Sequence, residues 1–320
     1  MTDAAALPQL DGRLMTCGGG FETWLQYIDG FTLRHFCAFE LLDDDRGRAC
    51  LEAYHRKLVE AAVANGFGVI NEGLHYRTSR DWGELIGYSR EGLAEITARG
   101  IEFYRDIARD YHSEATPMVI GGCVGPRGDA YDTGRVEDAA EAEDYHSEQI
   151  VTMRDAGAEM VSAWTFSNVE EATGFARAAE GAGMPCMISF IAKGGRLNDG
   201  ATLEEAVGRI DDATGGGPLY YAVNCAHPTE FAPGLGPGGW MDRLGGFMPN
   251  AVAMELLSLC SLGHLEDGDP EELGGQMAAL AARFPHINVW GGCCGTDARH
   301  IAEIARQVRA VRDGAAVAAS

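Results

Sequence analysis

The sequence has no apolar run long enough to cross a membrane. A spanning helix needs about 20 consecutive apolar residues, and no stretch of the chain approaches this length. The first eight residues also lack both the basic segment and the apolar segment of a secretory signal. We therefore expect a protein without a membrane anchor that stays in the cytoplasm.

Basic residues are scarce as well. The chain has 25 Lys and Arg against 48 Asp and Glu, which gives a formal net charge of −23. This charge repels nucleic acids and anionic lipid surfaces, so we expect neither as a partner. A cationic small molecule would be attracted to such a protein.

The nine cysteines lack the dense, regular spacing of a disulfide-rich secreted domain. Their number is odd, and they are scattered over the whole chain at positions 17, 37, 50, 123, 186, 225, 260, 293 and 294. A reducing cytoplasm fits this distribution, which leaves the cysteines available for packing or metal binding.

Short apolar runs alternate with helical patterns along the chain. We expect strands at residues 13–17, 67–70, 117–121, 158–164, 185–190, 219–224, 244–248 and 287–290. We expect helices at residues 49–65, 81–107 with a break at Gly100, 136–156, 168–182, 202–210, 270–283 and 296–311. This order predicts an α/β fold, a (β/α)8 barrel forming one domain over residues 1–320, with loose termini at 1–10 and 314–320. An open, doubly wound sheet is the alternative.

Two adjacent cysteines follow the last expected strand. Cys293 and Cys294 lie between glycines, in Trp-Gly-Gly-Cys-Cys-Gly-Thr at residues 290–296. Their Cα atoms are about 3.8 Å apart, closer than is usual in a disulfide, so a metal suits this pair better. Catalytic zinc typically takes three protein ligands and keeps one open position.

Cys225 is the best candidate for a third ligand. It also ends an apolar run, at residues 219–224, and a barrel carries its chemistry at the carboxyl ends of its strands. The sequence thus predicts a zinc site of Cys225, Cys293 and Cys294. The alternative is that these are small buried cysteines without a ligand.

Taken together, these motifs resemble the homocysteine S-methyltransferase family. The resemblance rests on Asn224-Cys225 with residues 291–296, and on weaker pieces at residues 18–23, 122–126, 145–150, 188–190 and 195–197. It implies a (β/α)8 barrel in which zinc on the three cysteines activates a thiol for methylation. It also implies substrate-binding positions, for which we select Gly19, Gly20, Phe21, Glu22, Thr23, Glu72, Trp164 and Asn224.

Two positions depart from the family pattern. The family usually begins its first motif with Asp-Gly-Gly, where this chain has Gly18, and ends its fourth strand with Glu-Thr, where this chain has Trp164. The resemblance associates both acidic residues with the ammonium group of the amino-acid substrate. Glu22 or Glu72 is a candidate replacement; otherwise the acceptor is a thiol without an α-amino group.

Aromatic residues near strand ends suggest how a methyl donor is held. The chain is shorter than methionine synthases with cobalamin and folate modules, so we expect an onium donor such as S-methylmethionine or betaine. Aromatic faces bind such cations, and the candidates are Phe21, Trp24, Tyr76, Trp164 and Phe166. His75 and His227 are weaker candidates for proton transfer or metal binding.

The leading hypothesis is therefore a zinc-dependent S-methyltransferase that moves a methyl group from an onium donor to a thiol, with homocysteine as the favoured acceptor and methionine as the product. The alternatives are a methyltransferase acting on another thiol, a zinc lyase or hydrolase, and a non-catalytic zinc protein. The partners would be the two small-molecule substrates, and a homo-oligomer is compatible with the sequence.

Overall fold

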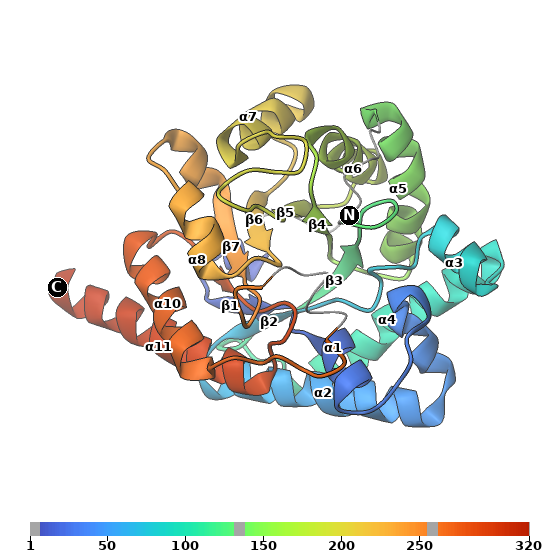
Figure 1. The fold of residues 1–320 in the computed structure, drawn as a ribbon, viewed down its shortest axis with the longest axis horizontal. Helices are drawn as coiled ribbons and strands as arrows, with labels where there is room; N and C mark the ends of the chain where they lie inside the picture. The colour runs from blue at the N-terminus through green and yellow to red at the C-terminus, as the bar shows by residue number, and fades with distance from the viewer. Residues whose placement is uncertain (1–6, 131–137, 255–261, 320) are drawn as a thin grey trace.

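The computed structural model describes residues 7–130, 138–254 and 262–319. Eight parallel strands close into a barrel in the order β1 to β8, and helices surround it (Figure 1). The predicted (β/α)8 barrel is confirmed. No helix among the described residues is both long and apolar enough to span a bilayer.

The strands fall where the apolar runs predicted them, within two residues at every end except that the strand predicted at 117–121 continues to Val124. They are β1 (Met15–Cys17), β2 (Gly68–Asn71), β3 (Met118–Val124), β4 (Met160–Phe166), β5 (Cys186–Phe190), β6 (Tyr220–Asn224), β7 (Leu244–Met248) and β8 (Val289–Trp290). Seven are buried along their whole length, and only Gly245 in β7 is partly exposed. Burial on both faces explains why they appear in the sequence as short continuous apolar runs.

The helices are α1 (Phe21–Tyr27), α2 (Asp45–Ala64), α3 (Arg80–Ile86), α4 (Arg90–Tyr111), α5 (Ala139–Asp155), α6 (Val169–Ala182), α7 (Leu203–Thr214), α8 (Pro228–Phe231), α10 (Pro270–Arg283) and α11 (Ala298–Ala319). Short 3₁₀ turns are Pro8–Asp11, Arg34–Phe36, Ala38–Asp43, Ala232–Gly234 and Gly239–Arg243. The predicted start of α5 at Val136 lies outside the described residues.

The helical segment predicted at 81–107 is two helices, and its break is not at Gly100. It falls at Gly87, which ends α3 with a φ of 93°, and Ser89 then caps α4 by accepting from the N–H of Gly92. Gly100 lies inside α4, where an added Cβ would be 2.5 Å from Nε2 of His75. The glycine is therefore needed for close packing and does not end the helix.

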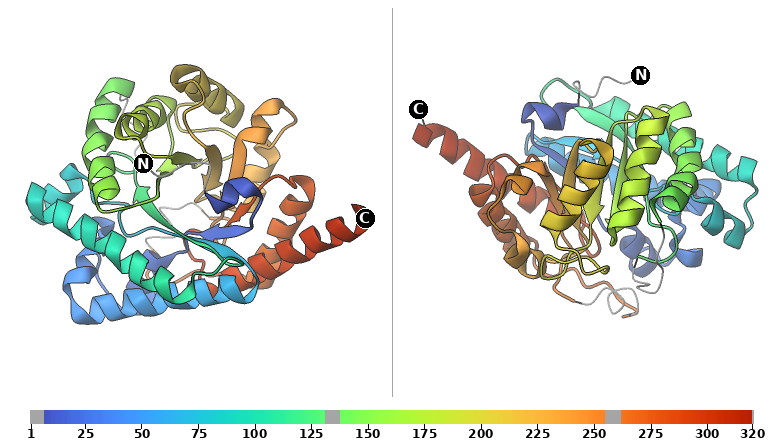
Figure 2. Two further views of the ribbon diagram at one scale, coloured as in Figure 1. Left: turned by 180° about the vertical axis from the view of Figure 1, so that it is seen from behind. Right: turned by 90° about the horizontal axis from the view of Figure 1, so that it is seen from above.

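Secondary structure extends into both terminal segments where they are described. Leu7 is buried with the side chains that fill the barrel, and the turn Pro8–Asp11 lies at the barrel end opposite the view of Figure 1 (Figure 2, left). At the other end, α11 was expected to stop near Val311 but continues to Ala319 and projects from the barrel (Figures 1 and 2).

Candidate active site

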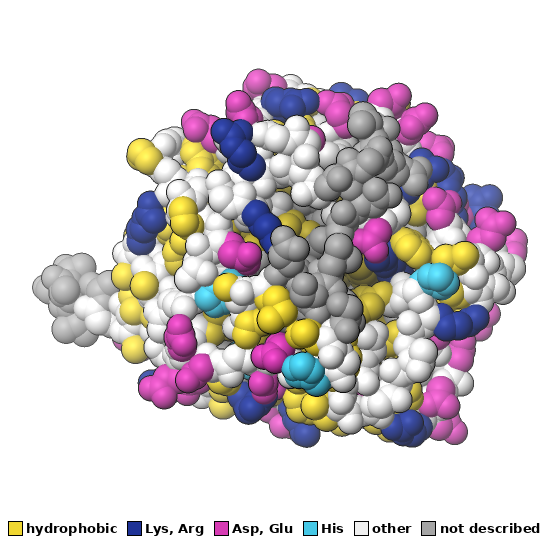
Figure 3. Space-filling model, viewed as in Figure 1, with side chains coloured by type: hydrophobic (Ala, Val, Ile, Leu, Met, Phe, Trp, Pro, Cys, Tyr) yellow, Lys and Arg dark blue, Asp and Glu magenta, His cyan; other side chains and the backbone are white. Residues whose placement is uncertain are grey.

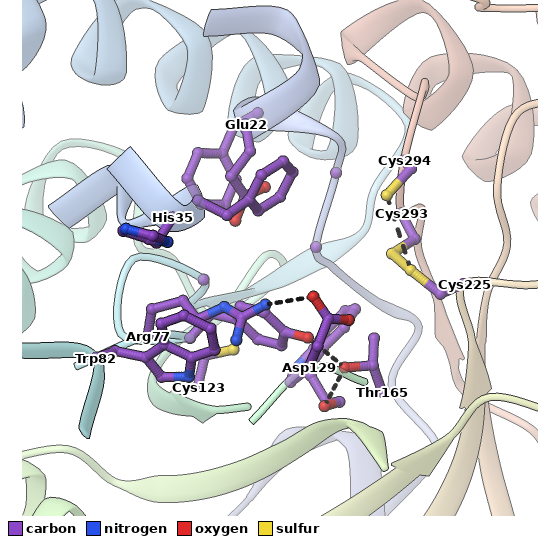
Figure 4. Close-up of a pocket in the computed structure, with 17 residues that line it drawn as sticks. Glu22, His35, Arg77, Trp82, Cys123, Asp129, Thr165, Cys225, Cys293 and Cys294 are labelled. Carbon is purple, nitrogen blue, oxygen red and sulfur yellow. Dashed lines mark hydrogen bonds and ion pairs between the residues drawn. A yellow bond between two sulfur atoms is a disulfide. The ribbon is translucent and has the colours of Figure 1, made fainter. Parts of the chain in front are cut away.

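The three predicted zinc ligands lie together at the carboxyl ends of β6 and β8. The sulfur atoms of Cys225, Cys293 and Cys294 all lie within 4.8 Å of one another. Cys225 and Cys293 are joined as a disulfide with a Cα–Cα distance of 5.5 Å, and Sγ of Cys294 is 3.8 Å from Sγ of Cys225 (Figure 4). The predicted grouping of the cysteines is thus present, although the pairing of Cys225 with Cys293 was not predicted.

The end of β7, which lies between β6 and β8, holds both cysteine loops. The N–H of Cys225 donates to the carbonyl oxygen of Met248 at 3.2 Å, and the N–H of Cys293 donates to that of Pro249 at 2.7 Å. Cys225 has a positive φ of 53°, a conformation that is unfavourable for a residue other than glycine. Such strain is commonly retained at functional sites.

Asn224, the last residue of β6, connects the cysteines to β4 and β5. Its Oδ1 accepts from the N–H of Thr165 at 3.1 Å and from the hydroxyl of Ser189 at 2.7 Å, and its Nδ2 donates to Sγ of Cys293 at 3.8 Å. Because the side chain is fully buried, these bonds fix its orientation. Its amide is therefore placed to stabilise negative charge on Cys293.

The donor set fits zinc. Tetrahedral zinc with bonds of about 2.3 Å places its thiolates roughly 3.8 Å apart, which matches the separation of Cys225 and Cys294. Within the described parts of the chain, no fourth His, Cys, Asp or Glu joins the group. Cys225 and Cys293 would have to be reduced to bind the metal.

A cavity of about 330 Å³ opens beside the sulfur atoms. Figure 3 shows the face of the barrel on which the carboxyl ends of the strands lie. The lining is largely aromatic and glycine-rich, with a few charged or titratable side chains besides the cysteines. The lining residues are Gly18, Gly19, Phe21, Glu22, His35, Phe36, Gly73, Tyr76, Arg77, Trp82, Cys123, Asp129, Trp164, Thr165, Cys225, Cys293 and Cys294. This volume suits a small substrate.

The structure divides the predicted substrate-binding residues into two groups. Four of them line the cavity: Gly19, Phe21, Glu22 and Trp164. The other four lie behind its wall: Gly20, Thr23, Glu72 and Asn224.

The residues behind the wall hold the lining in place. The hydroxyl of Thr23 donates to the carbonyl oxygen of Gly20 at 2.7 Å and accepts from the N–H of Gly295 at 3.3 Å, which connects the start of α1 to the cysteine loop. Glu72 accepts a hydrogen bond from Nε1 of Trp164 at 3.1 Å and so fixes the indole.

Three of the five aromatic candidates line the cavity. Phe21, Tyr76 and Trp164 do so, together with Trp82 and Phe36, which were not selected from the sequence. Trp24 packs on Tyr54 of α2 instead, and Phe166 is fully buried against His146 and Phe175.

Neither histidine candidate reaches the site. His75 is fully buried, and its Nε2 lies 3.2 Å from the carbonyl oxygen of Thr97 in α4. Burial lowers its pKa to about 4, so it stays neutral near pH 7. His227 caps α8 by accepting from the N–H of Thr229.

Burial also controls the charge of two cavity residues. It raises the pKa of Glu22 to about 8, so that carboxyl is mostly protonated at neutral pH. Burial, followed by the nearby Glu72, raises the pKa of the Cys123 thiol well above its usual value. Cys123 is therefore a neutral wall residue and not a nucleophile.

Six polar or aromatic residues of the cavity were not selected from the sequence: His35, Phe36, Arg77, Trp82, Asp129 and Thr165. Arg77 directly follows Tyr76 in the loop after β2, so its position after a strand end was the available signal. Asp129 lies in the loop after β3, where the same signal applies. His35 and Trp82 lie farther from any strand, and nothing in the pattern distinguishes them.

These features define an enzyme of the (β/α)8 class with a three-thiol site and a cavity at the carboxyl ends of its strands. The chain belongs to the homocysteine S-methyltransferase family, whose model matches residues 15–308. The predicted family is confirmed, and members of this family are methyltransferases.

One relative agrees with this assignment. The chain is 26% identical to methionine synthase of Mycobacterium leprae (strain TN) over 330 residues, which cover 98% of this chain but only 26% of that protein. The chain therefore spans about a quarter of the length of this relative.

Solved structures support the fold. The chain resembles the homocysteine methyltransferase MmuM from Escherichia coli in its oxidised form, with a TM-score of 0.73 and 17% identity over 94% of this chain and 97% of that one. For the metallated form the TM-score is 0.71, again at 17% identity, over 93% and 96% of the two chains.

Proposed function

We propose that this protein is a zinc-dependent S-methyltransferase that moves a methyl group from an onium donor to a thiol, with homocysteine as the favoured acceptor and methionine as the product. The observation that carries this proposal is the meeting of Cys225, Cys293 and Cys294 beside a cavity. The family and its named relatives support the choice of reaction. The reaction requires reduced thiols, in keeping with the expected cytoplasmic location.

Zinc on the three thiolates would ionise a thiol that enters its open position, because coordinated thiols lose their proton. The protein side chains then orient the reaction. Asn224 donates to Cys293 and, through its bonds to β4 and β5, fixes the position of the cysteine loop relative to these strands. The buried wall around Trp164 and Phe21 excludes water from the reacting atoms.

The methyl transfer needs no reactant besides the donor and the acceptor thiol. The acceptor thiol loses its proton to solvent, its sulfur forms a bond to the methyl carbon, and the bond from that carbon to the donor's cationic sulfur or nitrogen breaks. A neutral thioether or amine leaves. The aromatic lining and the charge of −23 favour a cationic donor over an anionic one.

The surroundings of Trp164 favour a second candidate acceptor, a thiol without an α-amino group. The indole ring lies so close to Gly18 that an added Cβ there would be 2.6 Å from Cη2. Neither position supplies a carboxylate, and the nearby Glu72 is bonded to the indole behind the wall. Glu22 remains the one cavity carboxyl on α1.

The test is a methyl-transfer assay on reduced, zinc-loaded protein with product detection by mass spectrometry. Homocysteine and 4-mercaptobutanoate, which differ only by the amino group, are compared as acceptors. S-methylmethionine, betaine, dimethylsulfoniopropionate and methylcobalamin are compared as donors. Methylation of a thiol that disappears when the metal is removed supports the proposal. Full activity in protein shown to contain no zinc would refute it.

A further inference from the structure

Arg77 is a buried cation in the wall of the cavity. It follows β2, and only 6% of its surface is exposed. Of the described residues that line the cavity, it is the only Arg or Lys. A buried guanidinium remains charged, so the wall carries a fixed positive charge. Figure 4 shows Arg77 and Trp82 on one side and the three cysteines on the other.

The described residues satisfy this charge only in part. Nη1 of Arg77 donates to the carbonyl oxygen of Gly128 at 2.8 Å. Among the described residues, the nearest carboxylate oxygen in an ion pair with Arg77 is Oδ2 of Asp129, 3.8 Å from Nη2, which is longer than a hydrogen bond. Asp129 is also about half exposed, which screens the pair. The guanidinium therefore keeps donor capacity for a ligand.

Aromatic rings hold the guanidinium plane. Its Cζ lies 3.9 Å from the ring centre of Trp82 and 5.2 Å from that of Tyr76. The hydroxyl of Tyr76 is in turn 2.6 Å from Oγ1 of Thr165. Because the aromatic rings cover the face of the guanidinium group, its N–H donors point outward in the plane of the group. This arrangement matches the two oxygens of a carboxylate.

Other cavity groups are poorer partners for an anion. The backbone N–H of Gly19 already donates to Gly292 at 2.7 Å, and that of Gly20 donates to Thr296 at 2.9 Å. Glu22, whose pKa is raised to about 8, carries no positive charge in either protonation state and repels an anion once it ionises. His35 lies at an exposed position.

We propose that Arg77 binds a carboxylate of the acceptor, so that the acceptor is a mercaptocarboxylic acid held with its sulfur at the cysteines and its acid group at Arg77. This assignment rests on the proposed methyl transfer, and it holds whether or not the acceptor also carries an amino group.

The test compares acids with the alcohols that replace their carboxylate. The pairs are 3-mercaptopropanoate with 3-mercaptopropanol, and 4-mercaptobutanoate with 4-mercaptobutanol. Because hydrogen bonds to charged groups contribute about 1.5–3 kcal/mol, kcat/KM should favour at least one acid by about 10- to 100-fold. Arg77→Gln should remove this preference by slowing the acid, while turnover of the alcohol changes less than about threefold. Arg77→Lys should retain part of the preference.

Arg80→Gln is the matched control, since Arg80 is close in sequence but partly exposed and paired with Asp144. It should leave the preference intact. Equal rates for acid and alcohol in the wild type, or an equal loss of both in Arg77→Gln, would overturn the assignment.

A binding measurement separates this inference from the proposed function. Calorimetry on the reduced protein compares 4-(methylthio)butanoate with 4-(methylthio)butanol, neither of which needs to react. Tighter binding of the acid, abolished in Arg77→Gln, supports Arg77 even if no thiol is methylated. Equal affinities in the wild type contradict it even if methylation occurs.

Discussion

Replacing Thr23 by Val tests whether this residue binds substrate or holds the cysteine loop. Its side chain is 3% exposed, and its hydroxyl joins Gly20 to Gly295, the residue that follows Cys294. Valine keeps the shape but leaves the buried N–H of Gly295 without its partner. An orphaned donor costs about 1–3 kcal/mol and the second bond about 1 kcal/mol. We expect a loss of roughly 2–4 kcal/mol in the free energy of unfolding.

The measurement is urea unfolding of reduced protein, read as a shift in midpoint at unchanged slope. Thr23→Ser keeps the hydroxyl and is the control, with an expected loss of less than about 1 kcal/mol. KM for the thiol should change less than about twofold in either variant, because the hydroxyl lies behind the wall. The reasoning fails if Thr23→Val leaves the midpoint in place and raises KM tenfold or more.

Substitutions at three other sites have distinct expected effects. Cys294→Ala should lose most of its bound zinc in metal analysis, while Cys50→Ala, on α2, should keep it; full zinc in the first variant would contradict the site. Gly18→Ala and Gly30→Ala introduce the same backbone strain, at φ values of 75° and 74°, but only the first meets a backbone oxygen, at 2.4 Å. Thermal unfolding should show about 1 kcal/mol lost at Gly30 and at least about 3 kcal/mol at Gly18; equal losses would exclude the clash. Burial raises the pKa of Glu72 from 4.5 to about 7, so the folded protein holds this proton more tightly and wild-type stability is lost as the pH rises through that window. Relative to the wild type, Glu72→Gln should therefore become more stable as the pH rises across that range, by about 1.4 kcal/mol of unfolding free energy per pH unit. A difference in unfolding free energy that stays constant between pH 4.5 and 7 would refute this.

The barrel and the cysteine cluster were predictable because each leaves a local signal. Buried parallel strands are short apolar runs, and a cysteine directly after such a run must lie at the carboxyl end of the barrel. Cys225 and Cys293 are 68 residues apart, yet this rule places them at the same end. It does not specify distances, so the disulfide between them could not be predicted.

The cavity wall was less predictable because it depends on packing between loops. Arg77 and Trp82 come from the segment after β2, and their stacking at 3.9 Å requires the loop to fold back on itself. The pattern of apolar residues in the sequence does not indicate that this loop folds back. Thr23 shows a different limit, since its family position suggested a substrate contact and gave no sign that its buried hydroxyl bonds to Gly20 and Gly295.

The two departures from the family pattern, Gly18 and Trp164, are physically linked because their side-chain positions overlap. At Gly18 any side chain would meet the carbonyl oxygen of Gly292 at 2.4 Å and the Trp164 ring at 2.6 Å. The indole is held there by its bond to Glu72. An acidic residue at position 18 is therefore incompatible with the indole at its present place, and the loss of one carboxylate is coupled to the loss of the other. Neither position supplies a carboxylate to the cavity, while Arg77 is buried in its wall. Under our proposal for Arg77, we therefore expect recognition of the acid end of the acceptor and weak recognition of an ammonium group.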